Sequence, residues 1–147
     1  MNEQALISQL GECFPERDFH TDNLTVLHKG RFANAIVYRY KDDKTDVVIK
    51  DFQHSPWLVR KTFARLFINQ EYKALARLQG MAGVSDEFHR LSSIGIAYAF
   101  IEGVPLRTLS KKGETVPKSF FNQLEHRPRA VNLWIHRYLV CADSFHR

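Results

Sequence analysis

Cysteine motifs, long apolar runs and internal repeats are all missing from this sequence of 147 residues. Its two cysteines, Cys13 and Cys141, lie far apart and form no CxxC pair, so we expect two free thiols in a reducing compartment. No apolar run approaches the ~20 residues that a membrane-spanning helix needs. The first ten residues carry an acid and no basic segment, which is unlike a secretory signal. We therefore expect a cytoplasmic protein, at most peripheral to the inner membrane.

The composition is that of one globular domain with an excess of positive charge. Hydrophobic residues make up 44% and aromatic residues 12%, which excludes a disordered chain. The formal net charge is +5, which fits an anionic partner and equally a mildly basic surface that binds none. The seven histidines show no i,i+4 pairing, no Ser or Cys has a His/Asp partner set, and no RNA-binding signature is present. A zinc site, a hydrolase triad and a nucleic-acid partner are therefore not expected.

Hydrophobic periodicity predicts five short strands and one long helix. The strands are expected within residues 24–30, 35–43, 45–52, 87–95 and 96–106. Between the third and fourth, Ser55 is the expected N-cap of a helix with Pro56 at its first position, and Gly80 is its stop. A break near Asn69 would divide this helix in two. The prediction is an α+β fold, in which a five-stranded antiparallel sheet carries one long helix.

Three segments follow from this pattern. Residues 1–21 are a polar lead-in, with a short helix through Leu6, Ile7 and Leu10. Residues 22–110 form the sheet-and-helix lobe, and residues 111–147 a helical tail. From His126 onward the composition shifts, with no Lys, Glu or Gly and frequent Arg and His. Two explanations stay open for this shift: an out-of-frame continuation from about residue 126, or a genuine helix whose buried stripe is Val131, Trp134, Ile135, Tyr138 and Leu139.

A lysine stands in the middle of the third predicted strand, in the stretch TDVVIKDFQ. Lys50 shares a strand face with Val48, and a lone buried ammonium costs several kcal/mol, so it needs a partner. Glu71 on the next helix shares a face with Leu75 and Leu78, at i+4 and i+7, and so points toward the sheet. A Lys50–Glu71 ion pair is one expectation. The other is that Lys50 extends to the sheet edge and Glu71 is solvated.

This order of elements resembles the N-terminal lobe of the protein-kinase-like superfamily. Lys50 in VVIK matches the V-A-I-K lysine, which contacts ATP phosphates, and Glu71 matches the helix glutamate that holds it. LHKGRFANAIVYRY resembles the glycine-rich loop, although His28 and Ala33 stand where glycines are usual. The segment YAFIEGVPL resembles the family's hinge, the segment whose main-chain groups contact adenine. The short linkers and FIEGVPLRTL are most similar to small bacterial kinases of the lipopolysaccharide-core (sugar) and RIO-like groups.

The resemblance implies an ATP-binding lobe of a phosphotransferase that acts on protein Ser/Thr or on lipopolysaccharide sugar. Lys50 would bind phosphate, Glu71 would orient it, and main-chain groups of Ala99 and Ile101 would meet adenine. The implied phosphate cover is Gly30, Arg31, Phe32 and Ala33. The family's Mg is expected, but its ligands are absent. We therefore expect weak nucleotide binding, no phosphotransfer, and self-association through an apolar face.

The residues that carry phosphoryl transfer in this family cannot be placed. His136 and Arg137 are followed by Tyr138, where the family has a catalytic Asp, and Asp143 does not begin a DFG-like metal motif. An enzymatic activity of this chain is thus left open. The alternative function is a small non-catalytic binding module or a pseudokinase regulator.

The stretch WLVRKTFARLFI is amphipathic and basic. On an ideal helix its apolar side comprises Leu58, Val59, Phe63, Leu66 and Phe67, and its basic side Arg60, Lys61 and Arg65. One interpretation is contact of the basic side with an anionic membrane surface or a phosphorylated sugar. The other is a helix that packs on its own sheet and turns its basic side to solvent.

Overall fold

The computed structural model describes residues 3–30, 34–80, 84–102, 104–105, 118 and 140–141. Its centre is a five-stranded sheet of β1 (Leu24–His28), β2 (Ile36–Lys41), β3 (Asp46–Asp51), β4 (Phe88–Ser92) and β5 (Gly95–Ala99). The strands lie in the order β1-β2-β3-β5-β4, and every neighbouring pair is antiparallel. The predicted α+β fold, an antiparallel sheet of five strands with a helix packed on it, is confirmed.

Strand β3 occupies the middle of the sheet, between β2 and β5. Five of its six residues are buried, from Val47 to Asp51. A central strand has hydrogen-bonded neighbours on both sides and side chains on both faces, so an almost continuous apolar run is its natural sequence. Lys50 and Asp51 are the two exceptions to that run.

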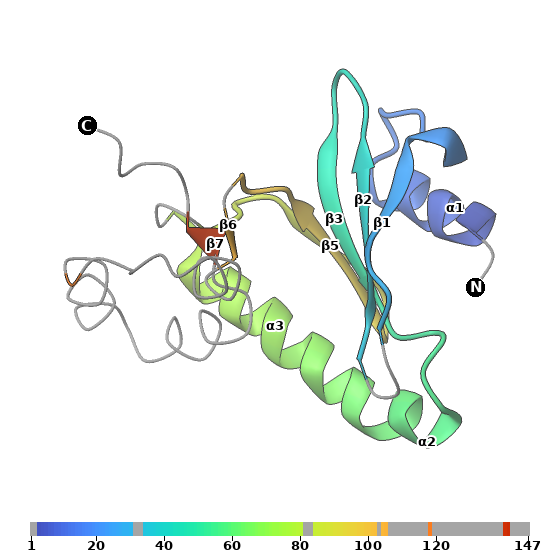
Figure 1. Ribbon diagram of the computed structural model, residues 1–147, viewed down its shortest axis with the longest axis vertical. Helices are drawn as coiled ribbons and strands as arrows, with labels where there is room; N and C mark the ends of the chain where they lie inside the picture. Colours follow the sequence, from blue (N-terminus) through green and yellow to red (C-terminus); the bar gives the residue numbers. More distant parts are fainter. Residues whose placement is uncertain are drawn as a thin grey trace.

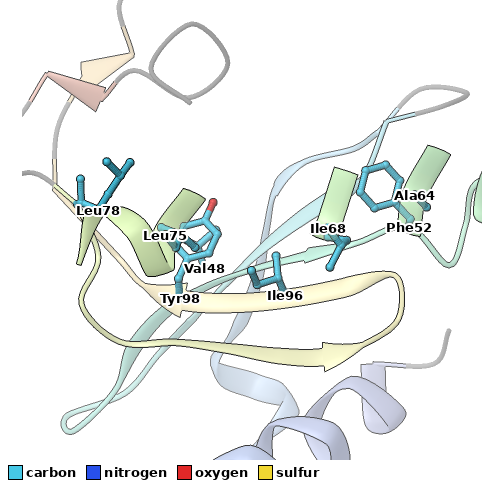
Figure 2. Packing of buried hydrophobic residues seen from close by; sticks show 9 residues of the cluster. Val48, Phe52, Ala64, Ile68, Leu75, Leu78, Ile96 and Tyr98 are labelled. Carbon is cyan, nitrogen blue, oxygen red and sulfur yellow. The ribbon is translucent and has the colours of Figure 1, made fainter. Parts of the chain in front are cut away.

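Helices cover both faces of the sheet, as Figure 1 shows. Helix α1 (Glu3–Cys13) is the short helix predicted in the lead-in, and it packs Leu6, Ile7 and Leu10 against one face. Helix α3 (Arg65–Leu78) packs on the opposite face, where Ile68 and Leu75 meet Val48, Ile96 and Tyr98 of the sheet (Figure 2). The single-turn η1 (Thr21–Asn23) connects α1 to β1. The result is a three-layer arrangement with two apolar clusters.

The long helix begins and bends differently from the prediction. It starts with α2 (Trp57–Val59), and Pro56 takes the N-cap position without a side-chain hydrogen bond. The expected N-cap, Ser55, is buried and its hydroxyl has no hydrogen-bond partner. The irregularity lies at η2 (Arg60–Ala64), a π-helical turn, rather than near Asn69. After α3, Gly80 takes a φ of +82°, which a glycine adopts without strain and which ends the helix as expected.

The π-helical turn changes which side chains of the helix face the sheet. The buried positions are Val59, Ala64, Ile68, Glu71, Leu75 and Leu78. The first step in that series is five residues, the spacing of a π turn, and the later steps are four or three. Leu58, Phe63 and Leu66 fall outside this series and are more than half exposed. The interpretation in which the apolar side of this stretch packs on the sheet therefore does not hold for these three side chains.

The predicted helical tail, residues 111–147, lies mostly outside the described residues. Within it, Val140–Cys141 form β7, a short strand that pairs with β6 (Val104–Pro105) in an antiparallel ladder. These two positions are therefore not helical. Lys118 is helical. Cys13 is a free thiol, as predicted, and the side chain of Cys141 lies outside the description.

Candidate functional site

Lys50 lies on the face of β3 that α3 covers. Its neighbours across the sheet are Val37 on β2 and Ile96 on β5. The residue is only 3% exposed. Because the strand is central and covered, the four methylenes of the side chain have no route to water along the sheet surface. The alternative in which Lys50 extends to the sheet edge is therefore wrong.

Glu71 approaches the same point from the helix. It lies within the buried stripe of α3, between Ile68 and Leu75, so helical phase alone turns it to the sheet. Its Oε1 accepts a hydrogen bond from Nζ of Lys50 at 2.5 Å, and both side chains are buried. The predicted ion pair between the third strand and the following helix is present. It joins two layers of the fold at one point.

An aromatic ring completes the surroundings of the ammonium. The Nζ atom of Lys50 lies 5.4 Å from the centroid of the Tyr98 ring, on β5. A cation over a ring face at this separation is attracted by the ring quadrupole. Carboxylate and ring together fix the position of an amine that would otherwise have many rotamers.

The loop between β1 and β2 ends beside Lys50. Val37, the second residue of β2, is the partner of Lys50, and the loop enters the strand just before it. A Cβ at Gly30 would collide with the carbonyl groups of Asn34 and Ala35, so only glycine permits this close approach. Sequence and register thus bring Gly30 and Lys50 to the same end of the sheet. The three other predicted phosphate-covering residues, Arg31, Phe32 and Ala33, lie outside the described residues.

The predicted hinge lies toward the other end of β5. Ala99 pairs with Val47, three residues from the pair of Ile96 with Lys50, which is about 10 Å along a strand. The amide of Ala99 already donates to the carbonyl of Glu87 at 2.9 Å. Among the backbone hydrogen bonds outside helices and strands in the described part of the chain, none involves Ile101. Of the two predicted adenine contacts, Ala99 is thus the one whose amide already has a partner among the described residues.

A second ion pair lies near the hinge. Both oxygens of Asp46 accept hydrogen bonds from Arg39, at 2.7 Å from Nε and 2.5 Å from Nη2. The guanidinium also stacks on Phe100, 3.6 Å from the ring centroid. The hydrogen bond to Asp46 raises the pKa of Arg39. This pair is partly exposed, so solvent screens it much more than it screens the pair of Lys50 and Glu71.

Asp51 follows Lys50 on the strand and was not singled out in the sequence. Its side chain is buried on the α1 face, where Oδ1 accepts a long hydrogen bond from the amide of Gln53 and Oδ2 has no partner. Burial raises the pKa of Asp51, and burial together with the nearby Asp51 charge raises the pKa of Tyr38. The signal was available, because strand alternation puts Asp51 on the same face as Val47 and Ile49.

The described residues hold no group of three or more His, Cys, Asp or Glu side chains that could bind a metal ion. The segments that carry His136 to Tyr138 and Asp143 lie outside the description. No helix within the described ranges is long and apolar enough to cross a membrane.

Comparison with known proteins gives no relative. No family model, no curated protein and no solved structure matches the chain.

Proposed function

We propose that this chain is a nucleotide-binding lobe of the protein-kinase-like kind, in which Lys50 binds phosphate oxygens of ATP. The observation that carries the proposal is the buried ion pair between Lys50 and Glu71. Replacing a buried ion pair with apolar side chains is often neutral or stabilising, so such a pair is a poor device for stability alone. A charged pair kept in the core at that disadvantage points to chemistry performed by one of its members.

Of the two members of the ion pair, we assign ligand binding to Lys50, as a phosphate-binding group, and not to Glu71, as a cation-binding group. The ammonium is a compact cation with three donors, and an ammonium of this kind binds phosphate oxygens through charge-assisted hydrogen bonds; here it donates one bond to Oε1 of Glu71. The loop at Gly30 enters the sheet beside it, where backbone amides could cover the same anion. The proposed adenine contact is the amide of Ile101, which lies two residues after the end of β5. The same proposal includes two further roles. The phosphate cover would comprise Arg31, Phe32 and Ala33, and a main-chain group of Ala99 would be a second adenine contact.

The proposed activity of the chain is binding without phosphoryl transfer. The family resemblance implies that ATP would bind together with Mg. The described residues contain no cluster of side chains that could bind this ion. The parent reaction would be transfer of the γ-phosphoryl group to a hydroxyl of a protein side chain or a lipopolysaccharide sugar. In this chain, Glu71 holds the lysine and Lys50 holds the phosphate.

A ligand series tests the phosphate assignment. The thermal midpoint of the full chain would be recorded with millimolar ATP, adenosine and inorganic triphosphate. Ligands that bind only the folded state stabilise it by RT ln(1 + [L]/Kd), so ATP and triphosphate should raise the midpoint and adenosine should raise it less. A midpoint that no ligand moves, or that adenosine moves as far as ATP, would contradict the proposal.

Two glycine variants sharpen this series. Gly30→Ala places a Cβ against the carbonyls of Asn34 and Ala35, so the loop must shift and ATP should stabilise less. Gly11→Ala is the matched control, because nothing lies within 4 Å of the added Cβ. The control should keep the full ATP response. Equal responses in the two variants would remove the loop from the site.

A further inference from the structure

The outer face of the long helix carries large apolar side chains that the fold leaves uncovered. Trp57 is 60% exposed and Leu58 is 63% exposed, and Phe63 and Leu66 are each more than half exposed. All four lie within ten residues of α2, η2 and the first turn of α3, and all four are exposed to solvent. Single exposed apolar residues need no explanation, but four large ones together mark an interaction surface.

The same face is positively charged. Lys61 and Arg65 are exposed among the four apolar side chains, and Arg60 is half-buried beside them. From Gln53 to Gln70 the sequence contains no Asp or Glu. The nearest acids that flank this segment, Asp51 and Glu71, are both buried on the sheet. The cationic charge of this outer face therefore has no acid of its own segment to neutralise it.

Apolar and cationic residues alternate along this segment, and one cation is in contact with an exposed ring. The Nζ atom of Lys61 lies 4.6 Å from the centroid of the Trp57 ring. Trp, Leu and Phe beside Lys and Arg is the composition of helices that lie in the interface of an anionic bilayer, with rings at headgroup level and cations at the phosphates. A second copy of the chain fits less well, because a two-fold contact would oppose the same cations.

We propose that the outer helix face formed by Trp57, Leu58, Lys61, Phe63, Arg65 and Leu66 binds the surface of an anionic phospholipid bilayer. The side chains would enter the headgroup region, and no part of the helix would span the membrane. Glu71 projects from the opposite side of the same helix, toward Lys50. Membrane binding would thus leave the sheet and the ion pair on the water side of the helix. The proposal does not depend on the nucleotide site.

Vesicle sedimentation with the full chain tests this surface. The probes are vesicles of phosphatidylcholine alone and of phosphatidylcholine with 30% phosphatidylglycerol, the latter at low salt and at 0.5 M NaCl. We expect binding to the anionic vesicles at low salt, at least tenfold weaker binding at high salt, and little binding to neutral vesicles. Salt weakens the attraction because it screens exposed charges. Equal binding to both kinds of vesicle, or binding to neither, would overturn the proposal.

Two pairs of substitutions test the apolar and the charged contributions to vesicle binding, and each is checked for an effect on folding. Leu58→Ser with Leu66→Ser removes apolar contact, and Lys61→Gln with Arg65→Gln removes charge. Each pair should weaken partition to anionic vesicles by at least tenfold, with an unchanged circular dichroism spectrum because all four side chains are exposed. The matched controls lie elsewhere on the surface: Val26→Ser with Leu27→Ser on β1, and Lys41→Gln at the end of β2 with Lys44→Gln in the turn after it. Controls should bind within twofold of the unmodified chain, and an equal loss in the controls would overturn the proposal.

Analytical ultracentrifugation without lipid tests the alternative in which a second copy of the chain covers this surface. A monomer that binds vesicles supports the bilayer assignment. Concentration-dependent dimerisation that Leu58→Ser with Leu66→Ser abolishes, together with no vesicle binding, would assign the same surface to a second copy and overturn the lipid proposal.

Discussion

Lys50 and Asp51 are consecutive residues of β3, and they make the most informative comparison in the molecule. Their side chains are buried on opposite faces of the same sheet, at 3% and 2% exposure. Lys50 meets a carboxylate from α3 at 2.5 Å. Asp51, on the α1 face, has one oxygen without a hydrogen bond among the described residues, and burial raises its pKa. The two buried charges thus differ in whether a side chain of opposite charge lies within hydrogen-bond distance.

The two faces differ because the helices differ. Helix α3 places Glu71 in its buried stripe, while α1 contributes Leu6, Ile7 and Leu10 to the sheet and no basic residue. An ionised carboxylate is therefore disfavoured on the α1 face, and the ammonium is stabilised on the α3 face. Substitutions on the two faces should therefore change stability by different amounts.

Breaking the buried pair should have the largest effect. Glu71→Leu leaves the ammonium of Lys50 buried without its carboxylate, and we expect the free energy of unfolding to fall by about 3–5 kcal/mol. Chemical denaturation with urea measures this. Glu87→Leu is the control, because Glu87 forms a partly exposed pair with Arg17 at 3.0 Å and should change stability by at most about 1 kcal/mol. Equal losses in the two variants would mean that burial does not distinguish them.

Removing both charges should reverse most of that loss. In the variant with Lys50→Met and Glu71→Leu, two apolar side chains of similar length replace the pair, and we expect unfolding within about 1 kcal/mol of the unmodified chain. The double-mutant cycle with each single variant then gives the coupling energy of the pair. A double variant as unstable as Glu71→Leu alone would show that the pair is required by the fold, and the functional argument would lose its basis.

Asp51→Asn should change how stability depends on pH. The pKa of Asp51 is raised in the fold, so its contribution to stability is complete below the ordinary carboxyl pKa of about 3.9 and is lost as the pH rises through the folded value. The amide cannot ionise and keeps the acceptor for Gln53. We expect Asp51→Asn to be more stable than the unmodified chain at pH 7, on the order of 1 kcal/mol, and the gain to vanish toward pH 4.

Thermal midpoints between pH 4 and pH 8 measure this difference. The control is Asp43→Asn, on the exposed turn between β2 and β3, which removes one carboxylate from the surface. A gain at Asp51 that is as large at pH 4 as at pH 7 would show that ionisation of the buried carboxyl is not its cause.

The partly exposed pair near the hinge should have the smallest effect. Asp46→Asn removes the charge opposite Arg39, and we expect a loss of at most about 1 kcal/mol that shrinks further in 0.5 M NaCl. Urea denaturation at the two salt concentrations measures it. A salt-independent loss as large as that of Glu71→Leu would contradict the contrast between buried and exposed pairs.

The sequence predicted the fold in those places where local pattern and burial agree. The apolar runs around β1 to β5 and the Gly80 stop each specify an element through a local rule, and Glu71 could be oriented from its spacing to Leu75 and Leu78. The π-helical turn could not be predicted, because the burial of both Val59 and Ala64, five residues apart, depends on tertiary packing that the local pattern does not show. The exposure of Leu58, Phe63 and Leu66 was not predicted either.

The site was predictable to the same degree. The Lys50–Glu71 pair followed from strand alternation and helical phase, and the structure contains it. The unpaired Asp51 was missed because the last residue of a strand is ordinarily solvated, and its burial depends on where α1 packs. The ring of Tyr98 beside Lys50 depends on β5 lying next to β3, which the order of the elements in the chain does not specify.

The role of Lys50 in phosphate binding is decided by the affinity for ATP of the unmodified chain and of the variant with Lys50→Met and Glu71→Leu. Isothermal titration calorimetry with ATP and with adenosine would be run on both, with Lys44→Met, which removes an exposed lysine, as control. We predict that the double variant stays folded, binds ATP at least tenfold more weakly, and no longer prefers ATP to adenosine, while Lys44→Met is unchanged. A folded double variant that keeps the ATP affinity of the unmodified chain would contradict the assignment of Lys50 to phosphate.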